Sequence, residues 1–247
     1  MNWWSKKRVL ITGCAGFVGS NLCRTLVEAG ADVLGLDLVP DSPSLRALEV
    51  QIPVARRDIT EFEGVKAEVA RVGPEIVFHL AGATHIAWSQ QNPLAAFESN
   101  VRGTWNVLEA CRKLPSLKAI VVASSNHVYG DLSKVDVPKI PYCWQEDDPC
   151  RQTDVYGTAK GCVDLLTRSY GVMGVPVAAL RHANGFGPGD PYRSRIVTGT
   201  ICDLLEGKAP IIKSDGTPIK SHLYIADICR AYLTVARAVV EEKIAPG

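Results

Sequence analysis

One glycine-rich run restricts the fold of this chain more than any other feature. The run TGCAGFVG, from Thr12 to Gly19, lies between an apolar stretch at 8–12 and a helix-patterned stretch at 18–29. Gly13 permits a tight turn, Gly16 lets the backbone approach a pyrophosphate, and Gly19 lets a helix pack closely on a strand. The helix start supplies free N–H groups and partial positive charge for an anion. The run predicts a dinucleotide-binding strand–turn–helix unit, although a glycine triplet alone is weak support.

The order of the remaining segments predicts an α/β fold with a doubly wound parallel sheet. Short apolar runs without strict alternation are typical of strands that are covered on both faces. We expect strands at 8–12, 33–37, 54–57, 76–80, 119–124 and 177–180. We expect helices at 18–29, 65–72, 93–112 and 155–169. Regular alternation of strand and helix places helices on both faces of the sheet.

The pattern changes after residue 180. A glycine- and proline-rich loop at 185–191 is followed by an expected helix at 196–206, a short strand at 211–212 and a helix at 226–239. We therefore divide the chain into a dinucleotide-binding domain at 1–180 and part of a substrate-binding region at 181–247. The long connection at 129–153 carries three prolines, and a loop of this length is usually functional or mobile.

The composition argues against macromolecular ligands. The chain has 27 Lys and Arg against 26 Asp and Glu, and no basic run stands out, so we expect neither nucleic acid nor a membrane surface as a partner. No apolar stretch is long enough to span a membrane. The eight cysteines form no CxxC pair. We expect reduced thiols in a cytoplasmic protein, and no metal site.

A carboxylate at the end of the second expected strand indicates which dinucleotide binds. Asp37 lies a little over twenty residues downstream of Gly16. A carboxylate there accepts hydrogen bonds from ribose hydroxyls and repels a 2′-phosphate. No arginine directly follows Asp37, so NAD is favoured over NADP. A solvated aspartate at a strand end is the alternative interpretation.

Tyr156 and Lys160 are four residues apart on an expected helix and therefore share one face. An ammonium group near a phenol favours the phenolate. Tyr156 is thus a candidate to exchange a proton with a sugar hydroxyl. A YxxxK spacing also arises by chance in ordinary amphipathic helices, so the pair needs support from other motifs.

That support comes from several motifs that occur in one order. They are TGCAGFVG, Asp37, Asp58-Ile59, HLAG at 79–82, NVRGT at 100–104, SSNHVYG at 124–130 and the Tyr156/Lys160 pair. Together they resemble the extended short-chain dehydrogenases/reductases, the NAD-dependent epimerase/dehydratase family. The segments RHANGFGPG at 181–189 and 214–227 resemble its nucleotide-sugar branch. The resemblance covers essentially the whole chain and implies a Rossmann fold.

The resemblance also implies the role of each site residue. Ser125, Tyr156 and Lys160 are implied as the catalytic set. The implied cofactor residues are Gly13, Gly16, Phe17, Val18, Gly19, Asp37, Asp58, Ile59, Leu80, Ala81, Gly82, Asn100, Ser124, Tyr156 and Lys160. The implied substrate residues are Ser125, Asn126, His127, Asn184, Arg195 and Lys220. For Arg195 and Lys220, a solvated surface charge is an equal alternative to a contact with the nucleotide diphosphate.

The reaction is indicated by a departure from the family pattern. Sugar 4,6-dehydratases carry an aspartate and then a glutamate or lysine after the catalytic Ser or Thr, whereas this chain has Asn126 and His127. Asparagine has no acidic proton to give, so we expect 4-epimerisation through a transient 4-keto sugar. His127 is a candidate base or a structural histidine. Dehydration, oxidation of a free sugar acid as in uronate dehydrogenases, and NAD binding without turnover are the alternatives.

Two further expectations follow from the resemblance. Relatives continue beyond the helix at 226–239, so we expect an incomplete sugar-binding part, in a naturally short form or in a shortened piece of a longer protein. Relatives also dimerise through the helices equivalent to 93–112 and 155–169. Both are present here, so we expect a homodimer.

Overall fold

The computed structural model describes residues 2–130, 143–212, 214–216 and 219–244. A six-stranded parallel sheet forms its centre, in the order β3-β2-β1-β4-β5-β6. Its strands are β1 (Arg8–Thr12), β2 (Asp32–Asp37), β3 (Val54–Arg56), β4 (Ile76–His79), β5 (Ala119–Ala123) and β6 (Val177–Leu180). The predicted doubly wound sheet is confirmed, and each strand agrees with its predicted range to within one residue at either end.

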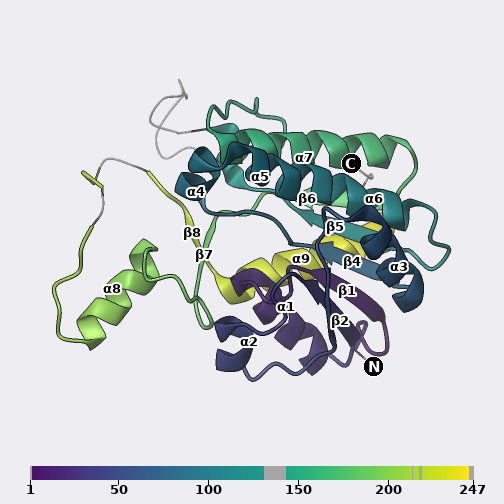
Figure 1. Ribbon diagram of the computed structural model, residues 1–247, viewed down its shortest axis with the longest axis horizontal. Helices are drawn as coiled ribbons and strands as arrows, with labels where there is room; N and C mark the ends of the chain where they lie inside the picture. Colours follow the sequence, from purple (N-terminus) through teal and green to yellow (C-terminus); the bar gives the residue numbers. More distant parts are fainter. Residues whose placement is uncertain (1, 131–142, 213, 217–218, 245–247) are drawn as a thin grey trace.

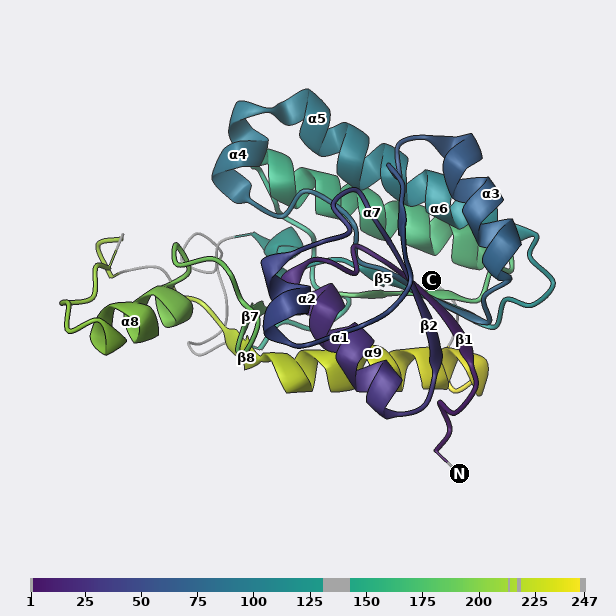
Figure 2. The ribbon, with the colours of Figure 1, turned by 60° about the horizontal axis from the view of Figure 1, so that its bottom comes forward.

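Helices cover both faces of the sheet, as Figure 2 shows. On one face lie α1 (Phe17–Glu28), α2 (Pro43–Ala47) and α9 (Ile225–Val240). On the other lie α3 (Phe62–Val72), α4 (Ile86–Gln91), α5 (Pro93–Phe97), α6 (Gly103–Arg112) and α7 (Val155–Val172). Short helical turns, η1 (Glu98–Arg102) and η2 (Asn126–Tyr129), complete this part.

Two buried clusters explain why the strands lack alternation of polar and apolar residues. Val9 and Ile11 of β1 pack in one cluster with α1 and α9, while Leu10 between them packs in the other with α3, α6 and α7. Successive side chains of a strand point to opposite faces. Both faces of β1 are therefore apolar and covered, which is the burial that its sequence predicts.

Residues 184–224 leave this body and return to it. The strands β7 (Asn184–Phe186) and β8 (His222–Tyr224) form a separate parallel pair, in which Asn184 lies opposite His222. Helix α8 (Ile196–Leu205), between them in the sequence, stands away from the layers in both ribbon views (Figure 1). Helix α9 then packs against α1, β5 and β6, so the last described helix belongs to the central core.

Some sequence-based expectations fail in this region. No strand forms at 211–212, where Ile211 and Ile212 are exposed. The short elements α2, α4, β7 and β8 were not predicted. The expected helix at 93–112 is interrupted by a π-helical turn, η1. Residues 131–142 of the long connection lie outside the described residues. No helix in the described ranges is long and apolar enough to cross a membrane.

Candidate active site

A cavity of about 1180 Å³ is lined by residues that follow β1, β2, β4, β5 and β6. Ligands of open parallel sheets bind at this carboxyl edge. Most of the predicted site residues line the cavity: Gly13, Gly16, Phe17, Val18, Gly19, Asp37, Asp58, Ile59, Leu80, Ala81, Gly82, Ser124, Ser125, Tyr156, Lys160, Asn184, Arg195 and Lys220. The fold thus brings together side chains that are up to two hundred residues apart in the sequence.

The glycine-rich turn has the geometry that its sequence predicts. Gly13 has a φ of +73°, and a Cβ added to it would lie 2.6 Å from the backbone nitrogen of Ala81. A Cβ added to Gly19 would lie 2.1 Å from the carbonyl oxygen of Gly13. Both positions therefore exclude any side chain. The close approach leaves the N-terminus of α1 facing the cavity, where its free N–H groups suit a pyrophosphate.

Asp37 is held beside this turn. Its Oδ2 accepts a hydrogen bond from the Ala15 backbone nitrogen at 3.0 Å, and its Oδ1 accepts one from the Val39 nitrogen at 3.0 Å. These two bonds fix the carboxylate at the cavity wall. A fixed carboxylate at the end of the second strand suits ribose hydroxyls and opposes a 2′-phosphate.

Two buried polar atoms near the turn have no hydrogen-bond partner among the described residues, namely Asn100 Oδ1 and Ser124 Oγ. The Asn100 amide donates to the carbonyls of Ala83 and Ala96, both at 3.0 Å. A Cβ on Gly82 would lie 2.5 Å from Asn100 Oδ1. Buried polar atoms are rarely left unsatisfied, so Ser124 Oγ, which borders the cavity, has spare capacity for a ligand. The residues of this wall therefore fit a dinucleotide. Asn100 itself is not among the lining residues.

Lys160 is fixed deep in the cavity wall. Its side chain is buried, and Nζ donates to the carbonyl oxygen of Ala123 at 2.8 Å. Burial lowers the pKa of Lys160 to about 8, against the opposing charge of Asp164. The small residue Gly161 follows it, and a Cβ there would collide with the amide of Gln152. Lys160 thus presents a partly desolvated amino group at the end of β5.

The ionisation of Tyr156 is controlled by its surroundings. Burial raises the pKa of Tyr156, a hydrogen bond with Ser125 lowers it, the charge of Asp154 raises it, and the charge of Arg195 lowers it. The cation that lowers the pKa of Tyr156 among the described residues is therefore Arg195, while Lys160 Nζ donates to the Ala123 carbonyl. The role of Lys160 beside the phenol stays a prediction.

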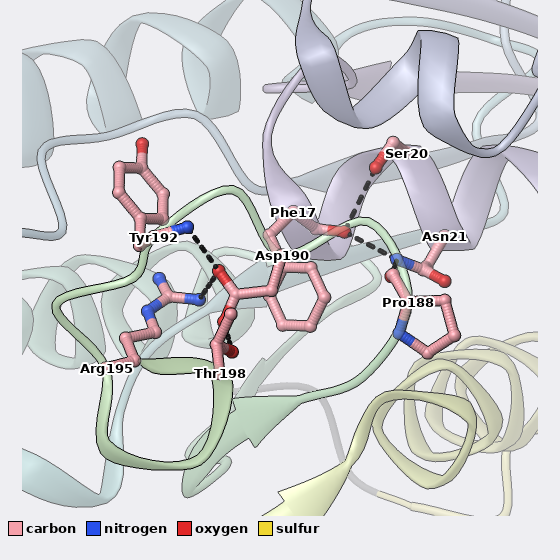
Figure 3. A network of polar contacts seen from close by, with 8 residues as sticks. All are labelled: Phe17, Ser20, Asn21, Pro188, Asp190, Tyr192, Arg195 and Thr198. Atoms are coloured by element: carbon pink, nitrogen blue, oxygen red, sulfur yellow. Dashed lines mark hydrogen bonds and ion pairs between the residues drawn. The ribbon is translucent and has the colours of Figure 1, made fainter. Parts of the chain in front are cut away.

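Arg195 is held by a buried carboxylate, as Figure 3 shows. Asp190 has a side chain only 1% exposed, and its Oδ1 accepts from Arg195 Nη1 at 3.0 Å and from the Tyr192 nitrogen at 3.1 Å. Its Oδ2 accepts from Thr198 Oγ1 at 2.6 Å. The guanidinium lies 5.4 Å from the centre of the Phe17 ring, at the start of α1. The contact brings segment 190–198 against the glycine-rich turn.

Asn126 and His127 are not among the residues that line the cavity, and their role as substrate contacts stays a prediction. Both lie on the turn η2, which begins directly after Ser125. The Asn126 backbone nitrogen donates to the His182 carbonyl at 3.2 Å. His127 Nε2 contacts Asp154 Oδ2 at 2.7 Å, at the start of α7.

The cavity also contains residues that the sequence analysis missed. His182 follows β6 directly, so its position at the carboxyl edge was a usable signal. Tyr232 reaches the cavity from α9, and its ring packs edge-on against His182 with centroids 5.8 Å apart. The sequence gives no sign that α9 contributes to this wall, because the helix is more than forty residues beyond β6.

Comparisons with known proteins agree with this geometry. A family model described as the NAD dependent epimerase/dehydratase family matches residues 9–245. The CDP-glucose 4,6-dehydratase of Salmonella typhimurium is 29% identical over 98% of this chain and 69% of that protein. A structure of UDP-glucose 4-epimerase from Thermotoga maritima, with UDP-glucose, has a TM-score of 0.81 and 27% identity, covering 91% of this chain and 72% of that one.

A third relative was solved with the cofactor. The dTDP-glucose 4,6-dehydratase of Streptomyces venezuelae, with NAD bound, has a TM-score of 0.80 and 25% identity, covering 94% of this chain and 72% of that one. The similar proteins therefore include both 4-epimerases and 4,6-dehydratases.

Proposed function

Since the chain belongs to the NAD-dependent epimerase/dehydratase family, we propose that it catalyses the 4-epimerisation of a nucleotide sugar. The single observation that carries this choice is the side-chain set around the reacting position. Ser125 and Tyr156 border the cavity, whereas Asn126, at the position of the dehydratase acid, does not. A 4-epimerase needs proton exchange at one oxygen only, and Tyr156 with Ser125 suffices for it.

The residues that would hold NAD are those of the turn and the adjoining wall. Gly13, Gly16 and the start of α1 would hold the pyrophosphate, Asp37 would hold the adenosine ribose, and Lys160 would hold the nicotinamide ribose. When bound, NAD supplies the two-electron oxidation and the later reduction of the sugar carbon. Arg195 and Lys220 are the cations available at the cavity for the substrate diphosphate.

The chain's own groups move one proton out and back. Ser125 Oγ donates to the reacting sugar oxygen and orients it. Tyr156 Oη accepts the proton of this hydroxyl during oxidation and returns it to the ketone oxygen during reduction. The sugar rotates in the site between oxidation and reduction and presents its opposite face. The product therefore differs from the substrate only in the configuration at the reacting carbon. No net proton is gained or lost.

Dehydration to a 4-keto-6-deoxy sugar is the second candidate, because the relative from Salmonella typhimurium named above is a 4,6-dehydratase. That reaction needs a group that protonates the departing hydroxyl. Asn126 has no such proton, and its position on η2 is outside the cavity lining. Dehydration would therefore need another residue to donate the proton that the dehydratases take from a carboxyl group at this position.

The decisive experiment incubates the NAD-loaded protein with UDP-, dTDP-, CDP- and GDP-hexoses and identifies products by mass and by sugar analysis. We expect an epimer of unchanged mass, and a product that lacks one water would establish dehydration instead. Replacing Tyr156 with Phe should reduce turnover by at least about a hundredfold while the NAD affinity stays within about twofold. NAD binding without turnover of any sugar, including free uronic acids, would overturn the proposed function.

We also propose a homodimer in the cytoplasm. Trp105 of α6 is 44% exposed and Leu165 of α7 is 66% exposed, and these two helices pack side by side on one face of the molecule. Large exposed apolar side chains on neighbouring helices are typical of an interface. The eight cysteines are all free thiols, which suits a reducing compartment. The division into parts at 1–180 and 181–247 is likewise a proposal.

A further inference from the structure

The pair formed by His127 and Asp154 lies immediately behind the reacting residues and has no part in the proposed mechanism. His127 Nε2 and Asp154 Oδ2 are 2.7 Å apart, and the side chains are 23% and 30% exposed. His127 is the second residue after Ser125, and Asp154 is the second residue before Tyr156. The contact therefore joins the backbone segments that present the two reacting hydroxyls.

Each partner is fixed by further bonds. Asp154 is the N-cap of α7, and its Oδ1 accepts from the Gly157 nitrogen at 3.0 Å. The His127 backbone nitrogen donates to Ser125 Oγ at 3.1 Å. The His127 ring lies 5.8 Å from the Tyr156 ring, between centroids. A Cβ on Gly157 would lie 3.1 Å from His127 Cδ2, so the glycine leaves room for the imidazole on the first turn of α7.

The charge on this pair acts directly on Tyr156. The Asp154 carboxylate raises the pKa of the phenol, since a nearby negative charge disfavours phenolate. Burial opposes ionisation of Asp154 itself, but the Gly157 hydrogen bond and the His127 imidazole hold its pKa below the ordinary value. Asp154 is thus held as a carboxylate beside the phenol, with the His127 ring as its partner.

We propose that His127 and Asp154 act as positioning residues that adjust the proton affinity of Tyr156 from behind the cavity. The Asp154 carboxylate opposes the phenolate, and the His127 ring holds this carboxylate at the first turn of α7, beside Tyr156. The inference rests on the proposed function, because it assigns the pair a role in the proton exchange of Tyr156.

The other charged and titratable groups around Tyr156 are accounted for. Arg195, from the segment before α8, favours the phenolate and keeps its charge throughout the accessible pH range. Lys160, one turn along α7, donates to a carbonyl of β5, and burial lowers its pKa to about 8. His182, after β6, is buried, and burial lowers its pKa, so it stays neutral. Tyr232, from α9, is fully buried, and burial raises its pKa well above the ordinary value. Among these described groups, Asp154 is the one whose charge opposes the phenolate.

Two single variants test the inference because they act in opposite directions. Asp154→Asn removes the negative charge, lowers the pKa of Tyr156, and should extend activity to lower pH by roughly one pH unit in the acid limb of kcat/KM. His127→Asn keeps a hydrogen-bond donor for Asp154 but removes the imidazole that offsets the charge of this carboxylate. It should move the same limb to higher pH. The double variant should behave like Asp154→Asn, because His127 acts through the carboxylate.

Asp227→Asn is the matched control. Asp227 lies in the first turn of α9 and ion-pairs with exposed Arg230, so this variant removes a carboxylate from another helix start and should leave the limb unmoved. If the acid limb of kcat/KM moves in the same direction in both test variants, or moves in neither, the inference is overturned. Unfolding curves of each variant identify any loss of folded protein.

A spectroscopic titration separates this inference from the proposed function. Tyrosinate absorbs in the ultraviolet, and the difference between each protein and its Tyr156→Phe version reports Tyr156 alone in the NAD complex. Opposite shifts of this titration should appear even if no nucleotide sugar is turned over. Unshifted titrations together with normal epimerase activity would reject the role of the pair and leave the proposed function standing.

Discussion

Gly13 shows how one residue can serve both the fold and the ligand site. Its φ of +73° is unfavourable for other residues, and its missing side chain lets the Ala81 backbone approach. Gly174 meets only the first of these constraints. It has a φ of +85°, but nothing lies within 4 Å of an added Cβ. A comparison of the two positions therefore distinguishes the energetic cost of a left-handed backbone from the cost of a steric clash.

We expect Gly13→Ala to destabilise the protein more than Gly174→Ala. The Gly174 variant should lose only about 1 kcal/mol, the cost of placing alanine in the left-handed region. The Gly13 variant bears that cost and must also displace the backbone after β4, so it should lose several kcal/mol and bind NAD at least about tenfold more weakly. Urea unfolding and NAD titration measure the two effects. Equal losses of stability in the two variants would contradict the steric argument.

Residues near Ser125 show what the sequence did and did not predict. The motif order correctly brought Ser125, Tyr156 and Lys160 to one cavity, because each lies at or just after a strand end or on a helix that borders it. It did not predict that η2 would direct His127 to Asp154, since that contact joins positions 27 residues apart across the long connection. Side-chain direction in a short turn depends on its tertiary partners.

At the scale of elements, the helices and strands that bury much apolar surface were predicted correctly, and the short ones were missed. The six strands of the central sheet and the long helices carry regular apolar patterns and were located to within a few residues. The elements α2, α4, β7 and β8 have three to six residues each and were missed, because so few positions give no periodic signal. The strand expected at 211–212 did not form, since exposed isoleucines there find no neighbouring strand in the described chain.

The segment that carries Arg195 depends on a single buried carboxylate. Asp190→Asn should therefore destabilise the protein by about 3 kcal/mol, because it leaves Arg195 beside a neutral group that has lost part of its hydrogen bonding. Asp227→Asn, which breaks the exposed pair with Arg230, should cost less than about 1 kcal/mol. Chemical denaturation compares the two. A loss for Asp190→Asn as small as the control would show that the segment does not depend on the ion pair.

At the scale of the whole molecule, exposed apolar side chains of the described residues lie, among other places, on α6 and α7 and on α8. If the first place is the dimer interface, Leu165→Glu should convert the protein to a monomer at micromolar concentration, because a desolvated carboxylate is costly in an apolar contact. Leu205→Glu is the matched control, since Leu205 is 83% exposed on α8, and it should leave the mass unchanged. Sedimentation velocity measures both. Dimers that persist in the Leu165 variant would exclude this interface.

The pairing of β7 with β8 has a consequence for how such a protein can change its substrate. Asn184 and His222 are neighbours, so the chain between them begins and ends at adjacent positions, although Pro188 and Arg195 also contact α1. The residues that we propose to bind NAD precede this point, and α9, which packs on the central sheet, follows it. The two ends of the 187–221 segment are thus adjacent in space, as the ends of an exchangeable insertion must be. Its replacement by the corresponding segment of another family member would alter the sugar-facing surface and leave the cofactor-binding frame in place, for evolution as much as for a protein engineer.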